Sequence, residues 1–232
     1  MPGSRLDEAI RIMDPVPRAV RIAFGKSWLD ADFVEARPGR GTVIFAHGSG
    51  SGRRSPRNRL VAEVLSARGV GTLLLDLLTQ AEARTDEVSG EYRFNIPLLT
   101  ERLVAASDWL IAQPAAGECP IGFFGASTGG AVAMVAAAQR AGAVGAIVLR
   151  GARSDLGDSA ARAILCPTLI LVGEHDDAVR ELNSRTLSLL RCEKQLTVIP
   201  GASHLFEEPG TLELVAERTA DWFDRYLRAP GK

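Results

Sequence analysis

IGFFGASTGGAVAMVAAAQR, residues 121–140, is the stretch around which the rest of the chain can be understood. Its first four residues favour a buried strand, GASTG follows, and an alanine-rich run typical of a helix comes directly after. Strand, sharp turn and helix are the context in which the motif G-x-S-x-G places a serine, here Ser127, on a strained turn. The small residues Gly129, Gly130 and Ala131 predict that this helix packs close behind the strand.

A chance match to the motif and a membrane span are two simpler explanations of this stretch. A G-x-S-x-G arises by chance roughly 0.1 times in a chain of this length, so the motif alone is moderate evidence. Residues 119–139 carry no charge, as in a membrane span. Glycine, serine and threonine interrupt the centre of the run, however, and strand and helix patterns continue on both sides, which favours the buried core of a soluble protein.

The composition is that of an ordinary globular protein. The chain has 232 residues, of which 46% are hydrophobic and 24% charged, with a formal net charge of −1. We expect a lead-in over residues 1–17, with a helical turn near residues 7–13, and a single domain over residues 18–232. The balanced charge argues against binding to nucleic acid or to anionic membranes. We expect a monomer or a homodimer.

The cysteines and the N-terminal residues indicate a compartment. Cys119, Cys166 and Cys192 show no metal-ligand spacing, which favours thiols in a reducing environment. The first residues lack the long apolar segment of a signal peptide, so we expect a cytoplasmic protein. Neither paired histidines nor a thiolate cluster is present, and we expect no metal and no cofactor.

Hydrophobic patterning predicts alternating strands and helices, and therefore a mainly parallel sheet covered by helices on both faces. The polar, acidic segment 77–93 is predicted as a surface loop with a broken helix. Ligand sites on such sheets lie at the carboxyl ends of the strands. Strands are predicted at residues 18–24, 28–36, 42–46, 70–75, 121–124, 146–149, 168–172 and 195–199, and helices at residues 57–68, 97–112, 130–140, 179–190 and 211–227.

A serine, an acid and a histidine each follow a predicted strand. A serine hydroxyl needs a base to take its proton, and the base needs a third group to hold its tautomer. Of the three histidines, His47 precedes Ser127 and His175 adjoins an acidic turn, whereas His204 follows the last strand. This order favours His204 as the base, against the alternative of a solvated loop residue.

The acid is less sharply defined by position. Asp176 and Asp177 both lie in the turn after strand 168–172, and Glu174 lies nearer the strand end. Each is also explained as an ordinary turn carboxylate.

A glycine-rich loop, HGSGSG at residues 47–52, follows a central strand. Acyl transfer requires N–H groups that stabilise an oxyanion, and we expect them from Thr128, which follows the serine, and from Ser49, with Gly50 as the next choice. The loop matches neither phosphate-binding motif, G-x-x-x-x-G-K-[ST] or G-x-G-x-x-G, so a phosphate cradle is disfavoured.

Basic residues follow this loop at positions 53, 54, 57 and 59. The simplest interpretation is a solvated face. The alternative is a clamp for an anionic substrate group, to which Arg53 and Arg153 are candidates, together with Arg150.

The residues that carry these motifs resemble the dienelactone hydrolase-like family of α/β-hydrolases. The matching segments are HGSGSGRRSPRN (47–58), TLLLDLLT (72–79), GFFGASTGG (122–130), VGEHDDAV (172–179) and GASHLFEEPG (201–210). The resemblance implies an α/β-hydrolase fold, assigns the acid to Asp176 and the base to His204, and includes relatives joined to phosphoribosyltransferases. No pyrophosphate-binding motif accompanies it here.

Two departures from the family narrow the expected function. Dienelactone hydrolases use a cysteine nucleophile, whereas this turn carries Ser127, and no long insertion follows strand 146–149, which predicts the absence of a large lid. We therefore expect a serine hydrolase for small carboxylic esters, with no cofactor. A thioesterase, amidase or lactonase using the same triad, and a non-catalytic ligand-binding protein of this fold, are the alternatives.

Overall fold

An eight-stranded sheet forms the centre of the molecule in the computed structural model, which describes residues 16–113 and 119–229. The strand order is β1-β2-β4-β3-β5-β6-β7-β8. Pairing is parallel from β4 to β8, while β2 pairs antiparallel with both β1 and β4. The mainly parallel sheet predicted from the sequence is confirmed. The expected lead-in over residues 1–17 and its helical turn fall almost wholly outside the described residues.

The elements alternate along the chain as the hydrophobic pattern predicts. The strands are β1 (Arg18–Phe24), β2 (Ser27–Val34), β3 (Thr42–Ala46), β4 (Gly71–Leu75), β5 (Ile121–Ala126), β6 (Val144–Arg150), β7 (Thr168–Gly173) and β8 (Lys194–Ile199). The helices are α2 (Pro56–Ala67), α3 (Gln80–Ser89), α4 (Ile96–Ile111), α5 (Thr128–Gln139), α6 (Asp177–Leu189) and α7 (Thr211–Tyr226), with short 3-10 turns η2 (Ser154–Leu156) and η3 (Asp158–Ala163) between β6 and β7.

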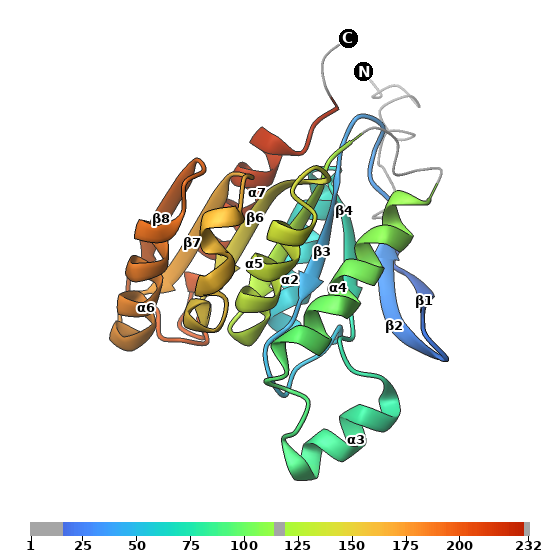
Figure 1. The fold of residues 1–232 in the computed structure, drawn as a ribbon. Coiled ribbons are helices and arrows are strands. Elements are labelled where there is room, and N and C mark those ends of the chain that lie inside the picture. Colours follow the sequence, from blue (N-terminus) through green and yellow to red (C-terminus); the bar gives the residue numbers. More distant parts are fainter. Residues whose placement is uncertain (1–15, 114–118, 230–232) are drawn as a thin grey trace, which may run out of the picture.

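Helices cover both faces of the sheet (Figure 1). One apolar core packs α4, α5 and α6 against strand residues such as Ile44, Leu73 and Phe123. The other packs α2 and α7 against alternate residues of the same strands, such as Phe45 and Phe124. Because successive strand side chains point to opposite faces, strands β3, β4, β5 and β7 are buried along their whole length.

The segment between β4 and α4 is more ordered than the sequence indicated. In place of a broken helix it forms α3, a complete helix that projects from the body of the protein (Figure 1). Thr79 and Glu82 form a capping box at its start, and Gly90 ends it in the left-handed conformation. These local caps, rather than an apolar face, account for the helix. Across the described residues no large lid domain is present, and no helix is both long and apolar enough to cross a membrane.

Candidate active site

Ser127 lies at the turn between β5 and α5. Its backbone has φ 50° and ψ −120°, a conformation that non-glycine residues rarely adopt. The turn is held by three backbone hydrogen bonds: the Ser127 N–H donates to Arg150 O (3.0 Å), and Ser127 O accepts from Gly130 N (2.9 Å) and Arg153 N (3.0 Å). The strained serine is therefore fixed to the end of the neighbouring strand β6.

Close packing explains the glycines on either side of the serine. A Cβ atom on Gly125 would lie 2.5 Å from Gly129 O, and one on Gly129 would lie 2.1 Å from Ala46 O. Both are far inside van der Waals contact with backbone atoms, which cannot move aside cheaply. Helix α5 therefore approaches the ends of β3 and β5 only because these residues carry no side chain.

His204 and Asp176 form a direct hydrogen bond. His204 lies in the loop after β8 and Asp176 in the turn after β7, and the His204 Nδ1–H donates to Asp176 Oδ2 over 2.6 Å. The Asp176 side chain is largely buried, at 12% exposure, while that of His204 is 37% exposed. Because Nδ1 is committed to the carboxylate, Nε2 is left as the acceptor nitrogen of the ring.

The other acidic residues of this turn have different partners. Asp177 is exposed and pairs with Arg180 NH2 at 2.5 Å. The Glu174 Oε2 atom accepts from the Gly201 N–H at 2.7 Å, and the His175 N–H donates to Ala202 O at 2.9 Å. The residues after β7 thus hold the loop that carries the histidine, and only Asp176 contacts its ring among the three acids considered.

Backbone contacts bring the serine and the histidine to one edge of the sheet. A Cβ on Gly151, the residue after β6, would lie 3.4 Å from His204 Cε1, so the ring rests on this glycine. A Cβ on Gly48 would lie 3.2 Å from the Ser127 Cβ. Among the described residues the Ser127 hydroxyl has no hydrogen-bond partner, whereas the histidine–acid pair is already formed.

One expected oxyanion donor directly follows the serine in the chain, and the other follows Gly48, which packs against the serine. Thr128 is the first residue of α5, so its N–H has no partner within that helix. Ser49 lies exposed in the loop after β3, and no described hydrogen bond uses its N–H. Gly50 has φ 69°, which a glycine adopts without strain.

His47 has a structural position in the same loop. It is 9% exposed, its Nε2 accepts the Leu77 N–H at 3.0 Å, and its Nδ1–H donates to Gly48 O at 2.9 Å. Burial lowers the pKa of His47, which keeps the ring neutral. The position of His47 before Ser127 in the sequence argues against a role as the base. The structure shows that its ring instead anchors the loop.

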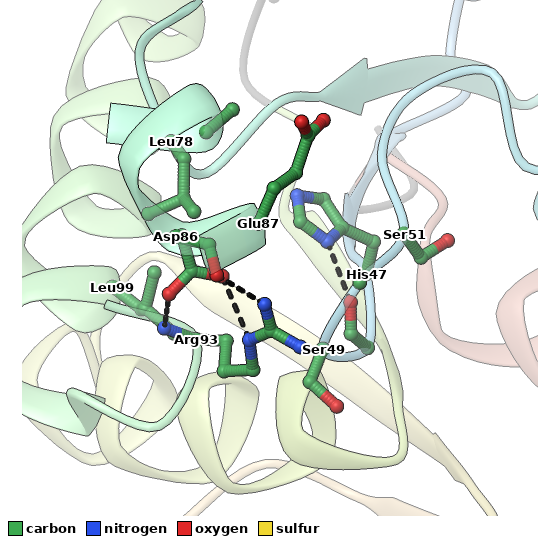
Figure 2. Close-up of a pocket in the computed structure, with 11 residues that line it drawn as sticks. His47, Ser49, Ser51, Leu78, Asp86, Glu87, Arg93 and Leu99 are labelled. Atoms are coloured by element: carbon green, nitrogen blue, oxygen red, sulfur yellow. Dashed lines mark hydrogen bonds and ion pairs between the residues drawn. The ribbon is translucent and has the colours of Figure 1, made fainter. Parts of the chain in front are cut away.

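A small pocket of about 140 Å³ is lined on one wall by this loop (Figure 2). Its second wall is formed by α3 and the segment that follows it. The Asp86 carboxylate there accepts from the N–H groups of Tyr92 (2.7 Å) and Arg93 (2.9 Å) and from Arg93 Nε (2.8 Å). Burial alone would raise the pKa of Asp86, but these hydrogen bonds hold it below its usual value. The lining residues are His47, Gly48, Ser49, Gly50, Ser51, Leu78, Ala83, Asp86, Glu87, Arg93 and Leu99.

Most of the arginines considered for an anion clamp are paired with carboxylates of the protein. Arg53 contacts Asp76 and lies 3.5 Å from Asp32, and Arg153 makes two 2.9 Å contacts with Asp155. Neither arginine lines the small pocket.

Arg150 is 7% exposed and forms no ion pair among the described residues. Its guanidinium stacks over the Phe206 ring, with 5.8 Å between Cζ and the ring centroid, and its NH1 has no hydrogen-bond partner in the described structure. Burial, with a smaller effect of nearby Arg57, lowers the pKa of Arg150 to about 10. It remains a cation at neutral pH.

No cluster of three or more histidine, cysteine, aspartate or glutamate side chains suited to a metal ion occurs among the residues that the structure describes. The three cysteines are free.

Comparison with known proteins identifies the family. Residues 39–221 match the model of a family described as "Alpha/beta hydrolase domain". The crystal structure of a dienelactone hydrolase from Anabaena variabilis is 49% identical, covers 93% of this chain and 100% of its own, and superposes with a TM-score of 0.91. The esterase Est1E from Butyrivibrio proteoclasticus is 18% identical, covers 89% of this chain and 98% of its own at a TM-score of 0.75, and shares the fold.

Curated relatives carry a different name. Two proteins from strains of Mycobacterium tuberculosis, each named "Putative phosphoribosyl transferase", are 46% identical over 230 residues. The match covers 99% of this chain and 48% of each relative, so the chain spans about half of their length. The family model and the Anabaena variabilis structure cover most of the described fold and support hydrolase activity. The chain belongs to the α/β-hydrolase family and to its dienelactone hydrolase-like branch.

Proposed function

We propose that the protein is a serine hydrolase that cleaves small carboxylic esters. The observation that carries the proposal is the 2.6 Å hydrogen bond between His204 Nδ1 and Asp176 Oδ2, at the sheet edge where the strained turn presents Ser127. A base whose tautomer is fixed by a largely buried carboxylate, at the same sheet edge as a half-buried serine, is the arrangement that activates a hydroxyl nucleophile.

The proposed reaction has two halves. The Ser127 Oγ attacks the ester carbonyl carbon while His204 Nε2 takes the hydroxyl proton. The N–H groups of Ser49 and Thr128 stabilise the oxyanion of the tetrahedral intermediate, which collapses to an acyl-serine as His204 returns the proton to the departing alcohol. Water, activated by the same ring, then releases the carboxylic acid. The steps use only groups of this chain and water.

The absence of a large lid domain from the described residues supports a small or solvent-accessible ester substrate. The 140 Å³ pocket beside the loop after β3 is lined by none of Ser127, Asp176 and His204, so its volume carries no argument about the acyl chain. Thioesters, amides and lactones follow the same chemistry, and the described site favours none of them over esters.

Hydrolysis of p-nitrophenyl esters from acetate to decanoate tests the proposal. We expect the highest kcat/KM at two to four acyl carbons, and a loss of at least about 10³-fold in Ser127→Ala. Ser188→Ala, which removes a hydroxyl from the exposed side of α6, is the matched control and should retain full activity. Substantial turnover by Ser127→Ala would contradict the mechanism.

Labelling with a fluorophosphonate separates the alternatives. Stoichiometric labelling at Ser127 without turnover of simple esters would mean an activated serine with a narrower substrate, and thioester, amide and lactone panels would follow. Absence of both turnover and labelling would favour a non-catalytic ligand-binding protein. The phosphoribosyl transferase name belongs to relatives about twice as long as the match and enters no step proposed here.

A further inference from the structure

The oxyanion loop, defined here as residues 47–53, is hydrogen-bonded at each end to one of the two residues that follow β4, Asp76 and Leu77. At its start, the His47 Nε2 accepts the Leu77 N–H at 3.0 Å. At its end, the Arg53 N–H donates to Asp76 Oδ1 at 2.6 Å, and the Arg53 guanidinium contacts Asp76 Oδ2. Two neighbouring residues, Asp76 and Leu77, thus close the loop that contains Ser49.

Little else in the described structure holds the middle of the loop. Ser49, Gly50 and Ser51 are exposed, and among the described residues the one backbone–backbone hydrogen bond between residues 48 and 51 runs from the Ser51 N–H to Gly48 O over 3.2 Å. A Cβ on Gly52 would lie 2.7 Å from Asp76 Oδ1, so the loop is pressed against this carboxylate. The position of the Ser49 N–H therefore depends on the two ends.

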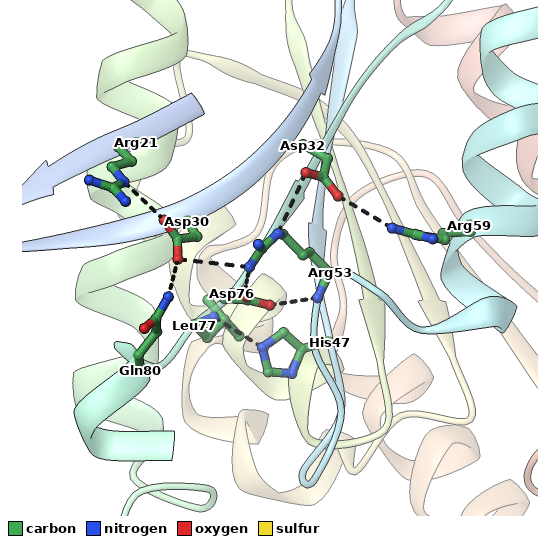
Figure 3. Close-up of polar contacts among 9 residues, drawn as sticks. All are labelled: Arg21, Asp30, Asp32, His47, Arg53, Arg59, Asp76, Leu77 and Gln80. Atoms are coloured by element: carbon green, nitrogen blue, oxygen red, sulfur yellow. Dashed lines mark hydrogen bonds and ion pairs between the residues drawn. The ribbon is translucent and has the colours of Figure 1, made fainter. Parts of the chain in front are cut away.

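The arginine at the end of the loop is the centre of a charge network (Figure 3). Its side chain is 18% exposed and lies 3.5 Å from Asp32 and 4.0 Å from Asp30, both on β2, in addition to its contact with Asp76. Three carboxylates around one guanidinium leave it firmly charged and directionally bound.

Two further arginines pair with the aspartates that surround Arg53. Arg59 lies 3.6 Å from Asp32, and Arg21 lies 3.4 Å from Asp30. Three aspartates therefore face three arginines. Only Arg53 also belongs to the loop, whereas Arg21 is a far more exposed residue of β1, at 72% exposure.

We propose that Arg53, clamped by Asp76, Asp32 and Asp30, is a positioning residue that fixes the Ser49 N–H for oxyanion binding. This inference rests on the proposed hydrolase function. Arg53 would then act by holding the loop backbone in place, whereas the sequence suggested that it contacts an anionic group of the substrate.

The test is Arg53→Met, which keeps the length of the side chain and removes its charge. Displacing one oxyanion donor should lower kcat on p-nitrophenyl acetate about 10- to 100-fold with little change in KM. Affinity for a trifluoromethyl ketone, which forms a tetrahedral adduct with the serine, should fall by a similar factor. Arg53→Lys should recover part of the loss, because it restores the charge without the forked geometry.

Arg21→Met is the matched control, since it removes one charge from the edge of the same network. It should leave kcat within about twofold of wild type. Asp76→Asn provides a second loop variant with nearly unchanged shape, in case Arg53→Met folds poorly. Wild-type kcat in both loop variants, or an equal loss in Arg21→Met, would overturn the proposal.

Hydrogen exchange of the amides of residues 48–52 gives a readout that does not depend on turnover. These amides should exchange faster in Arg53→Met than in Arg21→Met, while the amides of β3 and β4 stay protected. Unchanged exchange in the loop would overturn the clamp itself. Faster exchange in a protein without esterase activity or fluorophosphonate labelling would support the clamp and reject the proposed function, so the two failures are distinguishable.

Discussion

The two sides of the candidate site are held in place by different forces. On the acid–base side, the loops that carry Asp176 and His204 are joined mainly by backbone contacts between the ends of β7 and β8. On the oxyanion side, the loop after β3 is held by the charged side chain of Arg53 and by the neutral ring of His47.

This difference has consequences for robustness. Backbone hydrogen bonds between parallel strands persist through most side-chain substitutions, whereas a charge network depends on the identity of each member and on salt. We expect the acid–base side to be sensitive only at the residues that react, and the oxyanion side to be sensitive at residues that never touch substrate.

Replacing the acid should have the largest effect. In Asp176→Asn the amide no longer fixes the His204 tautomer, and we expect kcat/KM to fall about 10³- to 10⁴-fold in steady-state ester hydrolysis. Asp177→Asn, one residue along, should stay within about twofold, because Asp177 is exposed and pairs with Arg180. Equal losses in the two variants would remove the distinction between reacting and supporting residues on this side.

The turn between the two sides should tolerate no added side chain. Gly129→Ala places a methyl group 2.1 Å from Ala46 O, and we expect it to lower the free energy of unfolding by about 3 kcal/mol or more. Gly142→Ala meets no atom within 4 Å and should change it by less than about 0.5 kcal/mol. Urea denaturation measures both. A small loss in Gly129→Ala would mean that α5 has room to retreat from the strand ends.

Acid should weaken the oxyanion side through His47. Its pKa is lowered in the folded protein, so below about pH 6.5 the unfolded chain binds a proton that the folded protein does not. The stabilisation is present above the unfolded-state pKa and is lost as the pH falls toward the folded-state pKa, by at most about 1.4 kcal/mol per pH unit.

The measurement is the free energy of unfolding between pH 7.5 and 5, by urea denaturation of wild type and of His47→Gln. The variant should show the shallower fall over this range. Parallel curves for the two proteins would contradict the assignment of this pH dependence to His47.

The smallest effect is expected at Arg150, the buried arginine of the acid–base side. It has no carboxylate partner in the part of the chain that the structure describes, so Arg150→Met removes a desolvated charge and an unpaired donor while retaining side-chain bulk. We expect the free energy of unfolding to stay unchanged or to rise by about 1 kcal/mol, since buried charges are often replaced by apolar groups without loss. A decrease of about 2 kcal/mol or more in urea denaturation would show that its stacking on Phe206 outweighs the cost of burial.

Much of the fold could be read from hydrophobic patterning. Strand β1 and strand β3 begin and end where the alternating and continuous apolar runs predict, and most other elements agree within two residues. Helix α3 was predicted only as a broken helix within a surface loop, because its residues have no apolar face. Its stability comes from the Thr79 capping box, from the pairing of Asp86 with Arg93 seven residues along the chain, and from the pairing of Glu82 with Arg102 of α4. Hydrophobic periodicity registers none of these polar contacts.

Sequence alone indicates the order of chemical groups along the chain: a serine on a G-x-S-x-G turn, an acidic turn and a histidine loop, each after a strand. It could do so because these signals are local, set by backbone strain, strand length and the absence of side chains at a few glycines. Parallel pairing then brings the ends of those strands to one edge.

Which charged groups meet depends on how the chain folds in space. Asp176 and Asp177 are neighbours in the chain, but their side chains point in different directions. Asp176 therefore contacts the His204 ring, whereas Asp177 contacts Arg180. The partners of Arg53 come from β2 and from Asp76, the residue after β4, more than 20 residues away on either side. Charge pairing acts through space and carries no sequence period, so the sequence suggested a substrate clamp at Arg53, where the structure shows a guanidinium paired with aspartates of the protein.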